Sequence, residues 1–260
     1  MTQKREKPPQ SAKQVWEKHG MKSVIVLLIC ILAVVAFRAF VLYAEGDLTI
    51  DNLLVDLGLK PAPTATLADI PEYSGEAYVV LNDNWPDFDA EDMTTEPFEY
   101  YSELDSLGRC GVAYANVCLE IMPTEERGSI GQVKPSGWQT VKYDFIEGKY
   151  LYNRCHLIGY QLAGENANRQ NLITGTRYLN VTGMLPFENM VDNYVEETEN
   201  HVLYRVTPIF EGTNLVASGV QMEAFSVEDE GEGICFNVFV YNVQPGVTID
   251  YATGDSRAAE

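Results

Sequence analysis

Positive charge is scarce in this sequence, which has 18 Lys and Arg residues against 38 Asp and Glu residues and a formal net charge of −20. This balance excludes a uniformly basic surface, the usual feature of proteins that bind nucleic acid through its phosphates. The five Cys residues include no Cys-x-x-Cys spacing, so a zinc site of that type is excluded. Histidine occurs only three times, which leaves few candidates for a histidine base.

Long apolar runs are also rare, and the longest is Val24–Tyr43, which only Arg38 interrupts. Hydrophobic residues make up 46% of the chain and charged residues 22%, which excludes a largely disordered protein. The run is long enough to span about 30 Å of hydrocarbon, and Lys and Arg residues precede it. This pattern predicts a single-pass signal anchor in the cell membrane, with the N-terminus in the cytoplasm and the rest of the chain outside.

Two other interpretations of the apolar run stay open, a buried core helix and a cleaved signal peptide. Leu42-Tyr43-Ala44 is a poor cleavage site, which favours the uncleaved anchor over release of the protein. The predicted organisation is a basic cytoplasmic tail (1–22), a transmembrane segment (23–44), a Pro-containing stalk (45–72), a folded domain (73–254) and a C-terminal tail (255–260).

The folded domain has the sequence pattern of an antiparallel sheet. Alternating or β-branched and aromatic runs separated by turn residues predict strands at 78–81, 111–121, 202–210, 215–224 and 234–243. The clearest helix is Pro186–Thr198, which has Pro at its start and acidic residues in its first turns. Many strands and few helices predict an α+β class with an antiparallel β-sheet core.

The charges are unevenly distributed along the exported part, which carries 11 of the basic residues and 36 of the acidic ones. Seven of those 11 basic residues lie between Arg127 and Arg177, where only three acidic residues oppose them. A local phosphate-facing surface therefore remains compatible with an acidic chain. Chance clustering on a solvated face is the alternative interpretation.

One histidine lies inside this basic segment, in Tyr152-Asn-Arg-Cys-His-Leu-Ile-Gly-Tyr160. His19 is predicted to be cytoplasmic, and His201 lies between an acidic helix end and a strand. His156 is therefore the candidate for chemistry, although an isolated histidine is more often structural.

This segment resembles the DNA/RNA non-specific endonucleases of the ββα-metal type, particularly the DNA-entry and secreted nucleases of Gram-positive bacteria. Asn153-Arg154-Cys155-His156 is similar to the family signature Asp-Arg-Gly-His, and the apolar residues that follow it are similar too. Further similar segments are Leu107–Ala113, Pro135–Trp138, Asn171–Asn180 and Glu188–Asp192. The resemblance covers residues 75–254, and it implies a ββα-metal motif within a nuclease domain at 73–254.

The resemblance implies roles for individual residues. His156 is the general base, and Asn180 is the direct ligand of one Mg²⁺, with Mn²⁺ as a substitute. Asp192 holds the ion through water, at a position where the family usually has Glu. Arg154 acts with His156 in catalysis and, together with Arg177, contacts phosphate. Further substrate contacts are expected from the following residues: Lys149, Arg169 and Asn171, although a turn-forming role suits Asn171 better.

Two positions depart from the family signature. Asn153 replaces an Asp, which puts the rate and metal affinity in doubt, and Cys155 replaces a Gly. A Cys155 nucleophile is rejected, because adjacent residues in an extended segment point to opposite faces. The four exported Cys residues allow two disulfides or four free thiols, and the sequence favours neither.

The predicted function is metal-dependent, sequence-non-specific cleavage of extracellular DNA, RNA or both. The expected partners are nucleic acid and the membrane, and no protein partner can be deduced. Two alternatives stay open: a catalytically weakened module that binds nucleic acid at the cell surface, and a structural or adhesive β-rich ectodomain.

Overall fold

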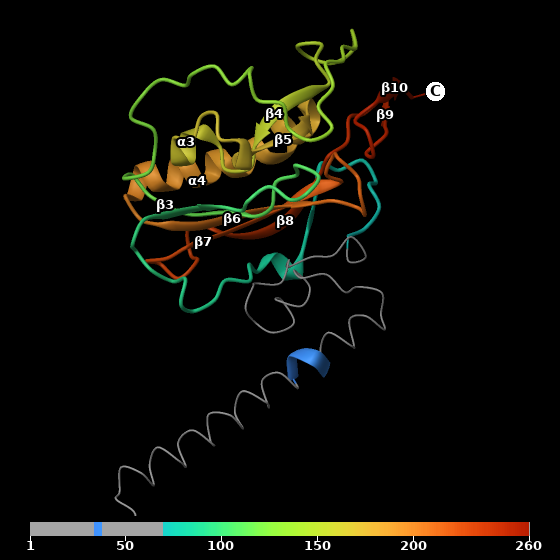
Figure 1. Ribbon diagram of the computed structural model, residues 1–260. Coiled ribbons are helices and arrows are strands. Elements are labelled where there is room, and N and C mark those ends of the chain that lie inside the picture. Colours follow the sequence, from blue (N-terminus) through green and yellow to red (C-terminus); the bar gives the residue numbers. More distant parts are fainter. Residues whose placement is uncertain (1–33, 38–69, 260) are drawn as a thin grey trace, which may run out of the picture. The chain divides into compact units, whose positions relative to one another are not determined.

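The computed structural model describes residues 34–37 and 70–259, and the elements discussed below belong to the compact unit Thr64–Glu260 (Figure 1). Most of the predicted tail, anchor and stalk lies outside these residues. In the part of the chain that is described, no helix combines the length and hydropathy that a bilayer span requires. The signal anchor therefore stays a prediction.

A six-stranded antiparallel sheet forms the main layer. Its strands in spatial order are β1 (Tyr78–Val80), β8 (Cys235–Tyr241), β7 (Gly219–Ser226), β6 (Val202–Ile209), β3 (Ala113–Val117) and β2 (Phe98–Tyr101). The 3₁₀ turn η2 (Asn82–Asn84) follows β1. The predicted α+β class with an antiparallel sheet is confirmed.

The second layer lies on one face of this sheet, where α3, α4, β4 and β5 are seen together in Figure 1. It contains a separate antiparallel pair, β4 (Tyr152–His156) and β5 (Leu172–Thr176), joined through α3 (Tyr160–Ala163) and the 3₁₀ turn η3 (Arg169–Asn171). The π-helical segment η4 (Tyr178–Met184) follows β5 and continues into α4 (Leu185–Thr198). Two strands and a helix thus form a ββα unit.

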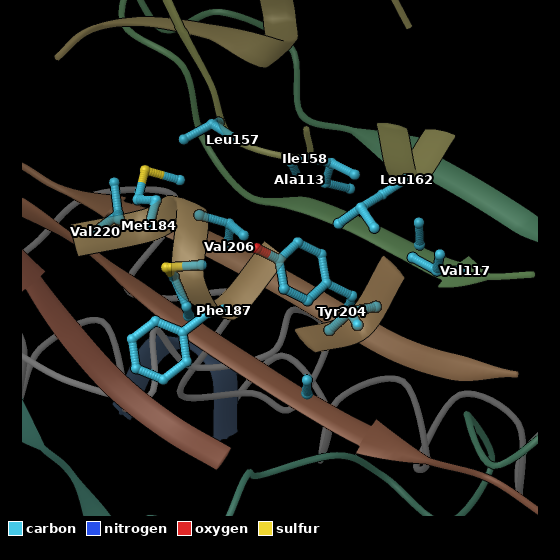
Figure 2. Packing of buried hydrophobic residues seen from close by; sticks show 14 of the residues in the cluster. Ala113, Val117, Leu157, Ile158, Leu162, Met184, Phe187, Tyr204, Val206 and Val220 are labelled. Atoms are coloured by element: carbon cyan, nitrogen blue, oxygen red, sulfur yellow. The ribbon is translucent and has the colours of Figure 1, made fainter. Parts of the chain in front are cut away.

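Apolar packing joins the two layers (Figure 2). Buried residues of α4 recur at helical spacing at Phe187, Val191 and Val195, and Met184 of η4 lies beside them in the same core cluster. They meet Tyr204 and other buried residues of β6 and β7. Burial of each such side chain contributes about 1.5–3 kcal/mol, so this contact holds the ββα unit on the sheet.

Strands β6 and β7 are buried at every position, so their polar residues need partners inside the protein. On the face away from α4, Arg205 Nε donates to Glu223 Oε2 at 2.9 Å. The backbone of Asp87 completes the arrangement, because its N–H donates to Glu223 and its C=O accepts from Arg205. The loop after η2 therefore covers the second face of the sheet.

The chain differs from the sequence predictions at two places near its C-terminus. Strand β7 begins at Gly219 and not at Leu215, because the Leu215 and Val216 N–H groups both donate to the Tyr251 carbonyl. Ser256–Ala258, predicted to be part of a tail, forms β10, which pairs with β9 (Val247–Ile249).

Candidate active site

The ββα unit opens onto a cavity of about 710 Å³. Strand β4 contributes Asn153, Arg154 and His156, the segment from β5 to α4 contributes further residues, and the long loop between β3 and β4 closes one side. The polar and charged residues around it include Arg127, Asn153, Arg154, His156, Arg177, Asn180 and Glu188. Side chains from distant parts of the sequence thus converge on one space.

The backbone fixes which nitrogen of the neutral His156 ring carries the proton. Its side chain is buried, and Nε2 lies 2.8 Å from the Asn166 carbonyl oxygen. Because a carbonyl oxygen only accepts hydrogen bonds, Nε2 carries the ring proton and Nδ1 keeps its lone pair. Burial lowers the pKa of His156 below its usual value, and nearby Arg127 lowers it further, while the hydrogen bond that His156 donates to the Asn166 carbonyl opposes them. His156 is therefore neutral at pH 7 and able to accept a proton.

Arg127 contacts the second ring nitrogen of this histidine. Its Nη2 lies 3.4 Å from His156 Nδ1. The sequence analysis named Arg127 only as one member of the basic segment. An irregular loop brings it to His156, and no local sequence pattern predicts such a contact. The guanidinium puts a permanent positive charge beside the histidine base.

Asn180 reaches the cavity from η4. The Leu185 N–H donates to the Asn180 carbonyl, five residues earlier, which is the hydrogen-bond pattern of a π-helix. The amide oxygen Oδ1 accepts a hydrogen bond from the Cys155 thiol at 3.0 Å. Gly183 lets η4 lie close to β8, since a Cβ there would approach Val240 Cγ1 to 2.2 Å.

Helix α4 supplies one carboxylate to the cavity, and it is that of Glu188. Burial raises the pKa of Glu188 to about 8, with a further increase from Asp192 and an opposing effect from Arg127. Asp192 itself lies one turn further along the helix and lines a separate hollow with Leu119 and Met122. The structure therefore brings Glu188, which the sequence analysis gave no role, to the position expected for Asp192.

The two predicted phosphate-binding arginines both line the cavity. The Arg154 guanidinium lies 4.0 Å from the centre of the Trp138 ring and donates to the carbonyls of Gly131 and Val133. Arg177 is less constrained, with Nη2 at 3.8 Å from an oxygen of the exposed Glu147. Arg154 is therefore built into the wall, while Arg177 keeps more donors for a ligand.

Three residues predicted to contact substrate lie outside the residues that line this cavity. Lys149 is exposed and pairs with Asp144 at 2.9 Å, and Arg169 is exposed on η3. Asn171 is fully buried, where its amide donates to the Ile158 carbonyl and accepts from the Ile158 N–H, both at 2.9 Å. It fixes the turn after His156 and cannot touch a substrate in this arrangement.

The cysteines of the described domain, Cys110, Cys118, Cys155 and Cys235, are free thiols. Cys155 faces Asn180 and Met184, and His156 faces Arg127 and Asn166. The two neighbours thus point in opposite directions, as predicted for an extended segment. Burial raises the pKa of Cys155 well above its usual value, so its thiol stays protonated.

Unsatisfied polar groups and oxygen donors meet at this cavity. Among the described residues, buried side-chain atoms without a partner include Nδ2 of Asn153 and Nε of Arg177, both from the cavity wall. Such groups are rare in proteins and indicate a polar ligand. Asn180 Oδ1 has only a weak thiol donor as its partner, and it shares the cavity with the Glu188 carboxylate. Neutral and acidic oxygens of this kind suit a hard divalent cation.

A ββα unit that brings a neutral histidine, arginines and oxygen ligands to one cavity is the arrangement of a nuclease that cleaves phosphodiester bonds. The chain belongs to the DNA/RNA non-specific endonuclease family, whose sequence profile matches residues 89–228. It is an enzyme that hydrolyses nucleic acid.

Solved nuclease structures share this fold. NucA from Streptococcus agalactiae with a bound magnesium ion is 28% identical, with a TM-score of 0.61, over 69% of this chain and 86% of NucA. The same nuclease without metal gives a TM-score of 0.64 at 27% identity, over 75% and 92% of the two chains. Sda1 nuclease with a bound zinc ion is 25% identical, with a TM-score of 0.60, over 71% of this chain and 97% of Sda1.

Proposed function

We propose that this endonuclease cuts DNA, RNA or both without sequence specificity, with His156 as the general base and one Mg²⁺ held by Asn180. The observation that carries the proposal is the neutral His156, whose unprotonated Nδ1 lies at the cavity beside Arg127. Membership of a non-specific endonuclease family supports the reaction type. Contacts to the phosphate backbone carry no sequence information, which agrees with the absence of specificity.

The chain's own residues perform most of the reaction. His156 Nδ1 removes the proton from a water molecule as that water attacks phosphorus, while the Asn166 carbonyl steadies the imidazolium that forms. Arg127 and Arg177 bind the phosphate oxygens through their guanidinium groups. The cation, when bound, neutralises charge that develops on the phosphate and on the leaving 3′-oxygen.

Asn180 and Glu188 are the residues that would hold the cation. A direct amide ligand with water in the remaining positions suits Mg²⁺, which dehydrates reluctantly. A nearby cation favours the charged form of Glu188, whose carboxylate would then accept hydrogen bonds from such waters, the role that the sequence suggested for Asp192. The magnesium in one NucA structure and the zinc in the Sda1 structure support a divalent cation, for which Mn²⁺ is a substitute.

Plasmid cleavage tests the reaction directly. The purified domain is expected to nick and then degrade supercoiled plasmid in the presence of Mg²⁺, and an excess of chelator should stop cleavage, because the cation is the group proposed to neutralise charge on the leaving 3′-oxygen. Added Mg²⁺ should restore it. Salt-dependent binding of plasmid without any cleavage would instead favour the weakened binding module.

The salt dependence of binding separates the arginines of the cavity from the other basic residues. With chelator present to prevent cleavage, Arg127→Gln combined with Arg177→Gln should lower the slope of log affinity against log salt by at most about two units. Lys149→Gln combined with Arg169→Gln is the matched control and should leave the slope unchanged, because both residues lie outside the cavity. Fluorescence anisotropy with labelled duplex DNA measures both slopes. An equal decrease of the slope in the two double variants would show that the substrate does not bind along this cavity.

We further propose that residues 23–44 anchor the enzyme in the cell membrane, with the nuclease domain on the outer side. The hydrophobic run and the basic residues before it support this location. Extracellular nucleic acid would then be the substrate.

A further inference from the structure

A second cluster of ligating side chains lies away from the nuclease cavity. Cys118, Glu120 and His201 place one potential ligand atom each within 4.8 Å of one another, and none of the three lines the cavity that holds His156. The first two flank Leu119 just after β3, and His201 directly precedes β6. The antiparallel register explains the meeting, because Val117 pairs with Val202 and the next positions along the two strands are 118 and 201.

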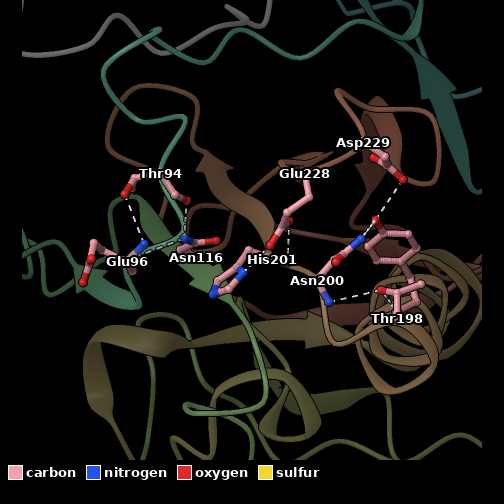
Figure 3. A network of polar contacts seen from close by, with 9 residues as sticks. Thr94, Glu96, Asn116, Thr198, Asn200, His201, Glu228 and Asp229 are labelled. Atoms are coloured by element: carbon pink, nitrogen blue, oxygen red, sulfur yellow. Dashed lines mark hydrogen bonds and ion pairs between the residues drawn. The ribbon is translucent and has the colours of Figure 1, made fainter.

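A carboxylate outside the cluster fixes the histidine (Figure 3). Glu228 Oε1 lies 2.6 Å from His201 Nδ1, and Glu228 Oε2 accepts the backbone N–H of His201 at 2.9 Å. Because a carboxylate only accepts hydrogen bonds, the contact with Oε1 places a proton on Nδ1, and the neutral ring keeps its lone pair on Nε2. A histidine that ligates a metal almost always donates its second nitrogen in this manner, which holds the ring and increases its basicity.

We propose that Cys118, Glu120 and His201 form a binding site for a Zn²⁺-class transition-metal ion, separate from the Mg²⁺ site of the nuclease reaction. A thiolate, an imidazole and a carboxylate are the ligands that Zn²⁺ prefers, whereas Mg²⁺ and Ca²⁺ avoid sulfur. Ligand atoms around tetrahedral zinc stand roughly 3.5 Å apart, so the cluster closes by about an ångström on binding. The exposed Glu120 side chain supplies that movement and leaves the fourth position to water.

The site would join two strands and the beginning of a functional loop. Cys118 follows β3, His201 precedes β6, and Glu120 begins the loop that carries Arg127 to His156. A bound ion would therefore stabilise the folded domain, since it binds the native arrangement and not the separated segments.

Cobalt(II) is the probe, because a thiolate ligand gives Co²⁺ a strong near-ultraviolet charge-transfer band. The reduced, full-length protein is titrated with Co²⁺ and then with Zn²⁺. The expected result is a band that saturates at one ion per chain, disappears when Zn²⁺ displaces Co²⁺, and is missing in Cys118→Ser. Zn²⁺ should also raise the unfolding temperature of the wild type but not of Cys118→Ser.

Control variants separate this site from the nuclease cavity. Cys155→Ser, Cys235→Ser and His156→Ala should all keep the band, even where cleavage is lost, so failure of the nuclease proposal leaves this result intact. Glu228→Ala should weaken Co²⁺ binding by about 10- to 100-fold, as loss of an outer carboxylate partner does elsewhere. A wild-type titration without the band, or a band that survives in Cys118→Ser, overturns the site.

Discussion

His156→Ala is expected to reduce plasmid cleavage by about 100-fold or more, the usual contribution of a general base. Arg127, its neighbour at the cavity, cannot take over this role, because it is a permanent cation and does not accept a proton. Initial rates at saturating Mg²⁺ measure the effect. Near-wild-type turnover in this variant would remove His156 from the reaction.

Folding and binding serve as the controls for this variant. Far-ultraviolet circular dichroism and anisotropy with labelled DNA in chelator should change little, because the side chain contacts Asn166 and Arg127 through its ring nitrogens and does not belong to the main hydrophobic core cluster. A large loss of either would mean that the cleavage defect reports structure and not chemistry.

The pH dependence of wild-type activity also tests His156 as the general base. The reactive form of His156 is unprotonated, and burial with Arg127 nearby lowers its pKa below the usual 6.5. Activity should therefore rise with pH through that lowered pKa and remain high at pH 6.5, where an ordinary histidine would be half protonated. This rise of activity with pH should be absent from the residual activity of His156→Ala.

Asn180→Ala is expected to reduce the cleavage rate by about 100-fold or more at limiting Mg²⁺. Loss of a residue that only supports a metal ligand typically lowers metal affinity or activity by about 10–100-fold, and loss of a direct ligand should lower it at least as much. The deficit lies in cation affinity, so high Mg²⁺ or Mn²⁺ should restore part of the rate. Rates measured across a metal titration test this, and a defect that no metal concentration alters would show that Asn180 is not the ligand.

Asn171→Ala is the matched control, since it removes the same amide from a neighbouring part of the ββα unit. The Ile158 N–H and carbonyl would lose their partners inside the protein, so the free energy of unfolding should fall by about 2 kcal/mol. Added metal should not restore its activity, because the buried amide faces Ile158 and does not line the cavity. Urea denaturation and the same metal titration distinguish the two variants.

Local sequence patterns predicted the main sheet because they depend on neighbouring residues. The helix predicted at Pro186–Thr198 corresponds to α4 within one residue, and the strands that become β1, β3, β6 and β8 were anticipated near their observed positions. The pair β4 and β5 was not recognised as a separate sheet, because a register between distant strands depends on packing against α4 and η4. β2 was missed entirely.

Local patterns also identified only some of the residues of the active site. Short motifs singled out His156, Arg154, Asn180 and Arg177, and the structure places all four around one cavity. Arg127 could not be found from motifs, since it lies 29 residues before His156 in a loop without periodicity. Glu188 was within reach: it is one helical turn before Asp192 on the same face, and the choice between them depends on where α4 begins relative to Asn180.

The π-helical turn before α4 has a consequence for which changes of length the chain can tolerate. An α-helix advances about 100° per residue, so eight residues of uninterrupted α-helix would leave Asn180 and Glu188 roughly 80° apart around the axis. A π turn advances only about 80° per residue, and four such steps followed by four α steps return the two side chains to nearly the same direction. If this turn relaxed to ordinary α-helix with the number of residues unchanged, Asn180 would rotate by about 80° away from Glu188, whereas deleting one residue between 181 and 184 would leave seven α-helical steps, about 700°, and keep the two side chains within about 20° of each other. Homologous chains that keep this chemistry should therefore have either the π turn or an uninterrupted α-helix that is one residue shorter between these two positions.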